Sequence, residues 1–224
     1  MKPCFPRHLF AFLFSFSLTL LAQPLAAILP VAGAGEGQYT ISLPFVAQGS
    51  LAPASGPTLP TLEAFTASVT NGQAGVAQGV YVTGTLALAI EQQPIGNAAY
   101  ITSNPDTISQ FQSAAYFGVT GLLAHNHLAG KKFFDLYLGQ DIKIVYGDGS
   151  HHTYRITAQH RFQALSPYNP NSNFVDLETG TTLSALEVFN QMYTGADHVT
   201  FQTCIAQDGV ASWGRLFVIA TPIE

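Results

Sequence analysis

The chain has 224 residues, which is enough for one domain with a substantial hydrophobic core and for additional segments. Hydrophobic residues make up 47% of the chain and charged residues only 9%, which argues against disorder over most of its length. Eight basic against thirteen acidic residues give a net charge of −5, so the chain lacks the basic face that binding to nucleic acid requires.

The N-terminus has the pattern of an export signal. Lys2 and Arg7 precede an almost unbroken apolar run over 9–22, and small residues follow. A run of this length is short for a membrane span, which needs about 20 residues, and is typical of a signal peptide. We expect residues 1–34 to be a signal peptide or, alternatively, an uncleaved anchor that would be the chain's only membrane contact. In both cases the remainder is expected outside the cytoplasm, secreted or at the cell surface.

The next segment, 35–79, is rich in Gly, Ala, Ser, Thr, Pro and Gln, and we expect it to be mostly linker with a short strand at 39–46. From about residue 80, β-branched and apolar residues come in short runs bounded by Gly, Pro, Asn and Asp, which indicates many short strands. The expected strands are 79–90, 98–102, 118–125, 141–146, 152–164, 198–203 and 215–221. Asp148 and Gly149 are expected to supply the positive-φ positions of a tight turn between two of them.

One helix is expected over 184–193, with Thr182 as its cap and with Leu186, Phe189 and Tyr193 on one face. A second, shorter helical segment is expected at 107–114.

Regularly spaced strands with few helices predict an all-β fold over 80–224: a closed β-barrel with one or two short helices.

The number and position of the cysteines limit the roles that a cysteine could have in this protein. Cys4 precedes the apolar run and would leave with the signal, so Cys204 would be the only thiol of the mature chain. A single cysteine cannot form an internal disulfide. It is then an inert buried residue, half of an intermolecular bridge, or a reactive thiol.

Two sequence fragments contain the cysteine and a histidine that could act with it. The fragment GLLAHNHLAGKKFFDLYLGQDIKI at 121–144 contains an apolar strand that ends in His125, followed by two phenylalanines, Leu136 and a Gly-Gln-Asp turn. The fragment HVTFQTC at 198–204 is an apolar strand that ends in Thr-Cys.

A third fragment, SWGRLFVIATPI at 212–223, brings in Arg215 eleven residues after Cys204. In this order and in these strand contexts, the three fragments resemble sortases, a family of exported cysteine transpeptidases. The resemblance covers roughly the last 145 residues. The chain departs from the family pattern at Ala124, where sortases usually have glycine, and in a second histidine, His127.

The resemblance implies a sortase-type barrel in which Cys204 is the nucleophile, His125 the acid and base, and Arg215 the group that stabilises the oxyanion or the substrate. Thr203 and His127 would lie beside the substrate. The implied reaction passes through a thioester acyl-enzyme, formed on a Leu-Pro-x-Thr-Gly-like sorting motif of a partner protein and resolved by an amine or by water.

The resemblance implies no obligatory cofactor. Some sortases bind calcium through acidic loops, and Asp176, Glu178 and Glu187 are available for this, although the sequence does not assign them. Histidines at 125, 127, 151 and 152 suggest zinc only weakly, because no acid or thiol lies at a matching spacing. The polar segment at 164–176 resembles by position the family loop that helps to form the peptide groove.

The three residue types also form a site on chemical grounds. A thiol attacks a carbonyl as thiolate, and a nearby imidazole can take its proton and pass one to the leaving amine. A fixed guanidinium can stabilise the negative oxygen of the tetrahedral intermediate. Because side chains alternate along a strand, Val199, Phe201 and Thr203 would share a core face, with Cys204 on the other.

Each residue also has a purely structural alternative. Cys204 could be a small buried hydrophobe, and Arg215 could form a surface ion pair. His125 could be a strand-end residue held by local hydrogen bonds, with His127 taking its place, because the two point to the same face if the strand continues. For the whole domain, the alternative is a catalytically inactive module of the same fold that binds peptide or has a structural role at the surface.

Overall fold

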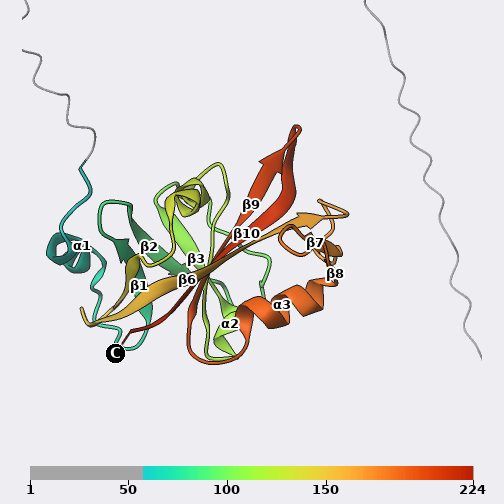
Figure 1. Ribbon diagram of the computed structural model, residues 1–224. Coiled ribbons are helices and arrows are strands. Elements are labelled where there is room, and N and C mark those ends of the chain that lie inside the picture. The colour runs from blue at the N-terminus through green and yellow to red at the C-terminus, as the bar shows by residue number, and fades with distance from the viewer. Residues whose placement is uncertain (1–57, 224) are drawn as a thin grey trace, which may run out of the picture. The chain divides into compact units, whose positions relative to one another are not determined.

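The computed structural model describes residues 58–223. The expected signal peptide at 1–34 and the expected strand at 39–46 lie outside the described residues. The helices are α1 (Leu62–Val69), α2 (Gln112–Ala115) and α3 (Ala185–Tyr193), with a 3₁₀ helix η1 (Ala129–Asp135). The strands, drawn in Figure 1, are β1 (Ala77–Val82), β2 (Leu86–Gln92), β3 (Thr107–Phe111), β4 (Thr120–Leu123), β5 (Asp141–Tyr146), β6 (His151–Ala164), β7 (Phe174–Asp176), β8 (Thr182–Leu183), β9 (Val199–Gln207) and β10 (Val210–Pro222).

Eight of these strands close into a barrel. Neighbouring strands follow the order β10-β9-β4-β3-β2-β1-β5-β6, and β10 also pairs with β6, which joins the two ends. The barrel is mixed, because β2–β3 and β4–β9 are parallel whereas the other pairs are antiparallel. β7 and β8 extend the sheet beyond β6. The closed all-β barrel with few short helices that the sequence predicts is confirmed.

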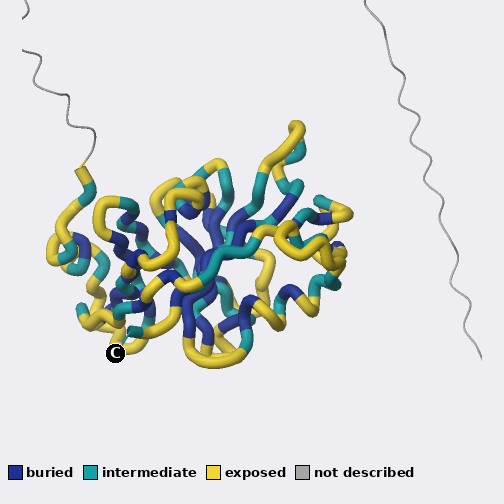
Figure 2. The backbone as a smooth tube through the Cα atoms, in the orientation of Figure 1, coloured by how far each residue is buried: buried dark blue, intermediate teal, exposed yellow. Residues whose placement is uncertain are grey.

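The interior of the barrel is a hydrophobic core to which every wall strand contributes. Leu88, Ile108 and Leu122 are fully buried there. The 3₁₀ helix η1 adds Phe133, whose ring meets that of Phe201 edge-on at 5.1 Å between centroids. Figure 2 shows this buried backbone at the centre of the domain, with the exposed residues in the surrounding loops. Burying each such side chain stabilises the fold by about 1.5–3 kcal/mol.

A second hydrophobic cluster lies on the outer face of the barrel wall, between β6 and β10 and the elements β7 and α3. Phe162 and Phe217 form its centre, with their ring centroids 5.6 Å apart and an angle of 80° between the planes. Val188, Met192 and Tyr193 close it from α3. This cluster fixes α3 against the strand that carries Arg215.

The described part of the expected linker 35–79 contains a helix. Thr61 caps α1 by accepting a hydrogen bond from the Ala64 amide at 3.2 Å. Phe65 is buried, and its ring lies 5.8 Å from that of Tyr81 on β1. The sequence analysis did not predict this helix because the segment is mostly polar. Phe65 is the one buried residue of α1, and it packs the helix onto the barrel.

Two strand predictions and one helix prediction need correction. Residues 79–90 form the hairpin β1–β2 instead of one strand, because Gly84 turns the chain with a φ of 72°. Residues 98–102 are not a strand: the Gln93 side chain donates to the carbonyls of Ala98 and Tyr100 at 3.2 and 2.7 Å, and so binds backbone that a ladder would otherwise pair. The expected helix at 107–114 is mostly β3, which pairs with β2, and only its end enters α2.

The turn between β5 and β6 differs in detail from the prediction. Gly149 has a φ of 86°, whereas Asp148 does not have a positive φ. Its carboxylate instead accepts hydrogen bonds from the amide and the hydroxyl of Ser150 at 3.0 and 2.6 Å, which holds the turn closed.

The helix α3 has the predicted position, but its cap is Ser184 and not Thr182. Ser184 and Glu187 form a reciprocal capping box, in which the Glu187 carboxylate accepts from the Ser184 amide at 2.7 Å. These hydrogen bonds from Ser184 hold the pKa of Glu187 below its ordinary value. The face predicted for the core is also shifted, because Leu186 is 67% exposed while Val188 and Met192 are buried.

Candidate active site

Cys204 and Arg215 lie on the adjacent strands β9 and β10, and His125 follows β4, the strand on the other side of β9, two residues after its end at Leu123. Arg215 of β10 is the register partner of Cys204 of β9. Leu123 of β4 is the partner of Gln202, and the Ala124 amide continues this parallel ladder by donating to the Gln202 carbonyl at 3.2 Å. Two residues beyond Leu123, His125 is therefore level with Cys204. Neighbouring strands lie about 4.8 Å apart, so this register places the backbones of Cys204 and Arg215 next to each other and brings the segment of His125 to the other side of Cys204.

The site lies on the outer face of the barrel wall and not at its rim. Residues that alternate with the site residues, such as Thr203 and Leu216, are buried toward the barrel interior. Phe217, on the same face as Arg215, belongs to the outer cluster under α3. Cys204 is a free, partly buried cysteine. The side-chain alternation predicted for 198–204 is confirmed except at Thr200, which is fully buried and donates to the Met192 carbonyl at 2.7 Å.

Backbone contacts hold His125 at the end of β4. Its carbonyl accepts hydrogen bonds from the amides of Leu128 and Gly130, both at 3.0 Å. The next residue, Asn126, donates from Nδ2 to the carbonyl of Ala211 at 2.9 Å, which ties the histidine segment to the β9–β10 hairpin. The segment is thus fixed on both sides.

The two histidines have different surroundings. His125 is partly buried, whereas His127 is exposed. Their ring centroids are 5.4 Å apart, with an angle of 31° between the ring planes. His127 thus lies beside His125 at the surface and is two residues further from the register position of Cys204.

Thr203 does not lie beside a substrate, contrary to our expectation. Its side chain is only 2% exposed and points away from the face of Cys204. The Thr203 hydroxyl donates to the carbonyl of Ala124 at 2.9 Å. This residue therefore bonds the strand of the cysteine to the segment of the histidine.

Arg215 makes contacts that orient its guanidinium without neutralising it. Its Nη1 donates to the carbonyls of Ser212 and Gly214 at 3.1 and 2.8 Å. Its Cζ lies 5.9 Å from the centre of the Phe174 ring, within the range of a cation–π contact. Within residues 58–223 no carboxylate lies in ion-pair distance of it. The surface ion pair considered as an alternative is thus not what holds this arginine there.

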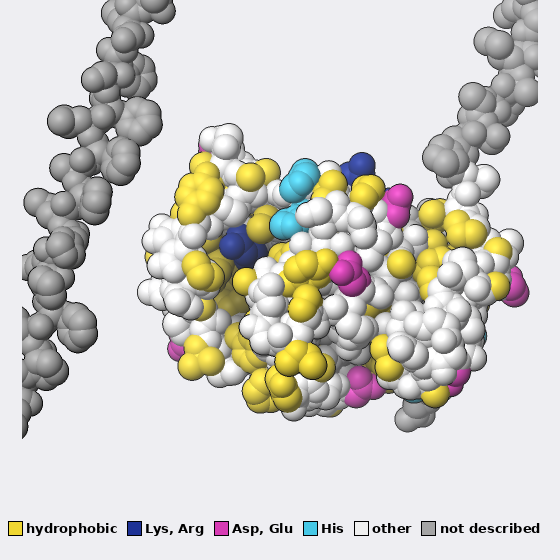
Figure 3. Space-filling model, turned by 180° about the vertical axis from the view of Figure 1, so that it is seen from behind, with side chains coloured by type: hydrophobic (Ala, Val, Ile, Leu, Met, Phe, Trp, Pro, Cys, Tyr) yellow, Lys and Arg dark blue, Asp and Glu magenta, His cyan; other side chains and the backbone are white. Residues whose placement is uncertain are grey.

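A groove runs from Arg215 along the outer face. Its cavity of about 340 Å³ has Arg215 and Gln202 at one side and is otherwise largely apolar. The aromatic side chains of Phe111, Phe189 and Tyr193 are among its lining residues. Figure 3 shows a basic side chain in a hollow with hydrophobic side chains around it and histidine side chains at its edge.

Two segments shape this groove. Pro170 and Phe174 line it from the 164–176 segment, the one that the sequence suggested for a peptide groove. On the α3 side, the hydroxyl of Tyr193 donates to Oε1 of Gln202 at 2.5 Å. Complete burial raises the pKa of Tyr193 well above its ordinary value, so this hydroxyl remains a donor.

The acidic residues considered for calcium have other contacts. Asp176 accepts from the Glu178 amide at 2.8 Å and from the Thr179 hydroxyl at 3.0 Å, and Glu187 serves in the capping box of α3. Among residues 58–223, no three His, Cys, Asp or Glu side chains are grouped so as to hold a metal ion. None of the helices in the same stretch combines the length and the hydropathy needed to cross a membrane.

The fold is similar to that of sortases. Sortase A from Corynebacterium diphtheriae aligns at 15% identity and a TM-score of 0.46, over 66% of this chain and 61% of that enzyme. Listeria monocytogenes sortase A aligns at 11% identity and a TM-score of 0.41, over 66% of this chain and 88% of the other. Clostridium perfringens sortase C, solved with the C-terminal cell wall sorting motif, aligns at 13% identity and a TM-score of 0.45, over 68% and 72%.

This chain thus spans about three fifths of the length of the diphtheria sortase. No family model and no curated protein matches the sequence. The similarity shows the fold; activity, substrate and partner are proposed below from the residues of this chain and from the motifs that resemble sortases.

Sequence reasoning missed the residues that support the site. Gly130 packs so closely that a Cβ there would lie 2.7 Å from the His125 carbonyl. Asn126 and Phe174 make contacts that depend on long-range packing. Only the glycine offered a local signal, since it falls within the apolar stretch that follows the histidine.

Proposed function

We propose that this chain is an exported cysteine transpeptidase or peptidase of the sortase type, with Cys204 as nucleophile, His125 as acid and base, and Arg215 as the stabilising cation. One observation carries the proposal: Arg215 and Cys204 are register partners, and His125 follows the neighbouring strand β4 two residues after Leu123, the partner of Gln202. Arg215 lines an apolar groove and is the single cation among its described lining residues, which also include Leu123 and Gln202 from the strands that lead to His125 and Cys204. Such a groove suits an extended, uncharged peptide segment.

The chemistry follows from these positions. His125 takes the proton of the Cys204 thiol, and the sulfur attacks a peptide carbonyl carbon to form a C–S bond. The electron pair of the carbonyl moves to oxygen, where the Arg215 guanidinium stabilises the negative charge. When the C–N bond breaks, protonated His125 gives its proton to the leaving amine. The remaining thioester is resolved by a second amine, which gives transfer, or by water, which gives hydrolysis.

Hydrogen bonding at the site supports these roles. The carbonyls of Ser212 and Gly214 occupy Nη1 of Arg215, and they hold the guanidinium in place before any substrate arrives. In a partly buried groove an oriented cation stabilises developing charge more strongly than it would in water. His127 is exposed beside His125, which suits a contact with the substrate or the acceptor but not proton transfer with the thiol.

By resemblance, the substrate is a short sorting motif of a surface protein, and the acceptor is an amine of the cell surface. The expected signal at 1–34 would deliver the domain to that location.

Trapping of the acyl-enzyme tests this function. The full chain is incubated with a peptide library that includes Leu-Pro-x-Thr-Gly sequences, with hydroxylamine as acceptor, and the products are read by mass spectrometry. We expect peptide hydroxamates, and a thioester adduct on the intact protein when hydroxylamine is left out. Cys204→Ala is expected to form neither.

Hydroxamate formation that persists in Cys204→Ala would contradict the mechanism. Equal retention of peptides by both proteins, without any adduct or product, would instead support the inactive binding module.

A further inference from the structure

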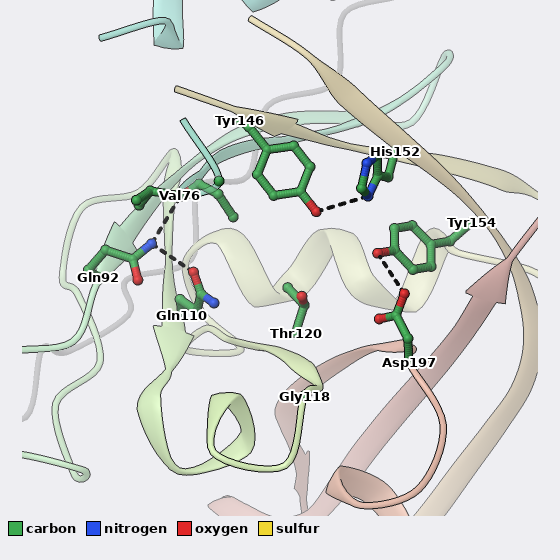
Figure 4. Close-up of a pocket in the computed structure, with 11 residues that line it drawn as sticks. Val76, Gln92, Gln110, Gly118, Thr120, Tyr146, His152, Tyr154 and Asp197 are labelled. Atoms are coloured by element: carbon green, nitrogen blue, oxygen red, sulfur yellow. Dashed lines mark hydrogen bonds between the residues drawn. The ribbon is translucent and has the colours of Figure 1, made fainter. Parts of the chain in front are cut away.

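A second cavity, separate from the groove, lies at the end of the barrel where β9 begins. Its volume is about 410 Å³, and Figure 4 shows its walls. It is lined by Gln92 and Gln110 on one side and by Tyr146, Tyr154 and Asp197 on the other. Asp197 precedes β9, and Cys204 lies five residues into that strand from Val199, about 17 Å along its axis. This cavity therefore does not belong to the proposed active site.

Two tyrosine hydroxyls project into the cavity from adjacent strands (Figure 4). The Tyr146 hydroxyl lies 3.3 Å from Nδ1 of His152, and the Tyr154 hydroxyl donates to Oδ2 of Asp197 at 3.4 Å. Burial is the first cause that raises the pKa of both tyrosines, so both stay neutral hydroxyls near pH 7. Opposite them, Gln92 donates to Oε1 of Gln110 at 2.7 Å.

The charge of the cavity is negative. Among the described residues that line it, Asp197 is the only carboxylate, and none is a lysine or an arginine. Within residues 58–223, Asp197 takes part in no ion pair. Asp197 is exposed and also lines the neighbouring hollow, where Lys143 donates to the Thr153 hydroxyl at 3.0 Å instead of pairing with it. His152, whose Nδ1 lies beside the Tyr146 hydroxyl, is the one histidine among the lining residues. A ligand that supplies one positive charge would thus complete this site.

The orientation of the tyrosines indicates the kind of ligand. Tyr154 is only 2% exposed, so its hydroxyl reaches the cavity while its ring face does not. The partly buried Tyr146 ring lies against the His152 ring, with 5.0 Å between the centroids, so it is the one tyrosine ring that offers part of its surface to a stacking ligand such as a sugar. What the cavity presents is a set of oxygen acceptors around a carboxylate, and an ammonium group has three N–H donors to match them.

We propose that this cavity binds an organic primary amine in its ammonium form, of the size of an amino-acid side chain or a short alkylamine. The Asp197 carboxylate is the counter-ion, and the tyrosine and glutamine oxygens accept the remaining donors. A cavity of this volume is within the usual range for small-molecule sites. The site is independent of the proposed chemistry at Cys204.

Calorimetric titration of the full chain with pentylamine at pH 7 tests this inference, with 1-pentanol as the uncharged isostere. We expect pentylamine to bind, 1-pentanol to bind at least tenfold more weakly, and Asp197→Asn to weaken pentylamine binding at least tenfold. The amide oxygen that this substitution introduces could still accept the hydrogen bond from Tyr154, so the variant should fold. Asp208→Asn removes the same charge at the tip of the β9–β10 hairpin, at a position whose φ of 51° asparagine tolerates, and should leave the affinity unchanged.

Three results with pentylamine, and a fourth with methyl glucoside, would overturn the inference. These are equal binding of pentanol and pentylamine, equal binding by wild type and Asp197→Asn, or an equal loss in Asp208→Asn, which would indicate general charge attraction. Tighter binding of methyl glucoside than of pentylamine would likewise overturn it. Cys204→Ala is expected to bind pentylamine with the affinity of the wild type, and a loss there would relocate the amine to the groove.

Discussion

Replacing Arg215 by alanine is expected to lower kcat/KM about a thousandfold, the loss that follows when one oxyanion donor is removed from an acyl-transfer site. Arg215→Lys is expected to lower it about a hundredfold, because a lysine ammonium keeps the charge but cannot reproduce the planar fork of N–H donors. The measurement is turnover of a peptide identified by acyl-enzyme trapping.

Stability should change little in these variants. Arg215 is in no ion pair within residues 58–223, and its described hydrogen bonds go to carbonyls of its own strand. Arg161→Lys is the matched control, because Arg161 is exposed on β6 and lies on the wall of a different hollow. Turnover by Arg215→Ala within threefold of wild type would contradict the role given to the guanidinium.

Replacing Gly130 by alanine is expected to reduce turnover about a hundredfold by moving His125, since a displacement of about 1 Å has that effect in a positioned site. A Cβ at Gly130 would lie 2.3 Å from Oγ1 of Thr203, 2.7 Å from the carbonyl oxygen of His125 and 2.9 Å from that of Ala124. Two of these three atoms are backbone and cannot rotate away. The histidine segment must therefore shift off β9, at a cost of about 1–3 kcal/mol in the free energy of unfolding.

Gly180→Ala is the control that distinguishes displacement of His125 from a general loss of folding stability. Gly180 has a φ of 73°, which disfavours alanine, but a Cβ there would meet nothing within 4 Å. Chemical denaturation should show both variants destabilised, while only Gly130→Ala loses turnover. Equal turnover in the two variants would show that the close packing at Gly130 does not position the histidine.

The barrel could be predicted from the sequence, and the three candidate site residues could be proposed from it, because the patterns behind both are local. Strand runs are visible as alternating side chains, and a lone mature cysteine after an apolar strand can be recognised without coordinates. The register that sets Arg215 opposite Cys204 depends on the bulge between Val210 and Gly214, which no local pattern marks. The outer-face location of the site likewise follows from how α3 packs, and Thr203 was misjudged because its hydroxyl partner, the Ala124 carbonyl, is 79 residues away.

The distinction between the two histidines was also beyond the sequence. His125 and His127 share a face only if β4 continues, and β4 ends at Leu123. The carbonyl of His125 then accepts the amides of Leu128 and Gly130, which turns the chain and leaves His127 exposed. Hydrogen bonding of a single carbonyl therefore separates two residues that the pattern treats as equivalent.

The central claim, that His125 acts on the thiol of Cys204, is tested most directly by the pH profile of alkylation by iodoacetamide. The full chain is used in a Cys4→Ser background, so that Cys204 is the only thiol. We predict that His125→Ala slows alkylation at least tenfold near pH 7 and alters the profile, because the group that accepts the thiol proton is gone. His127→Ala should stay within twofold of the wild type. Identical profiles for wild type and His125→Ala, or a larger effect of His127→Ala, would contradict the account.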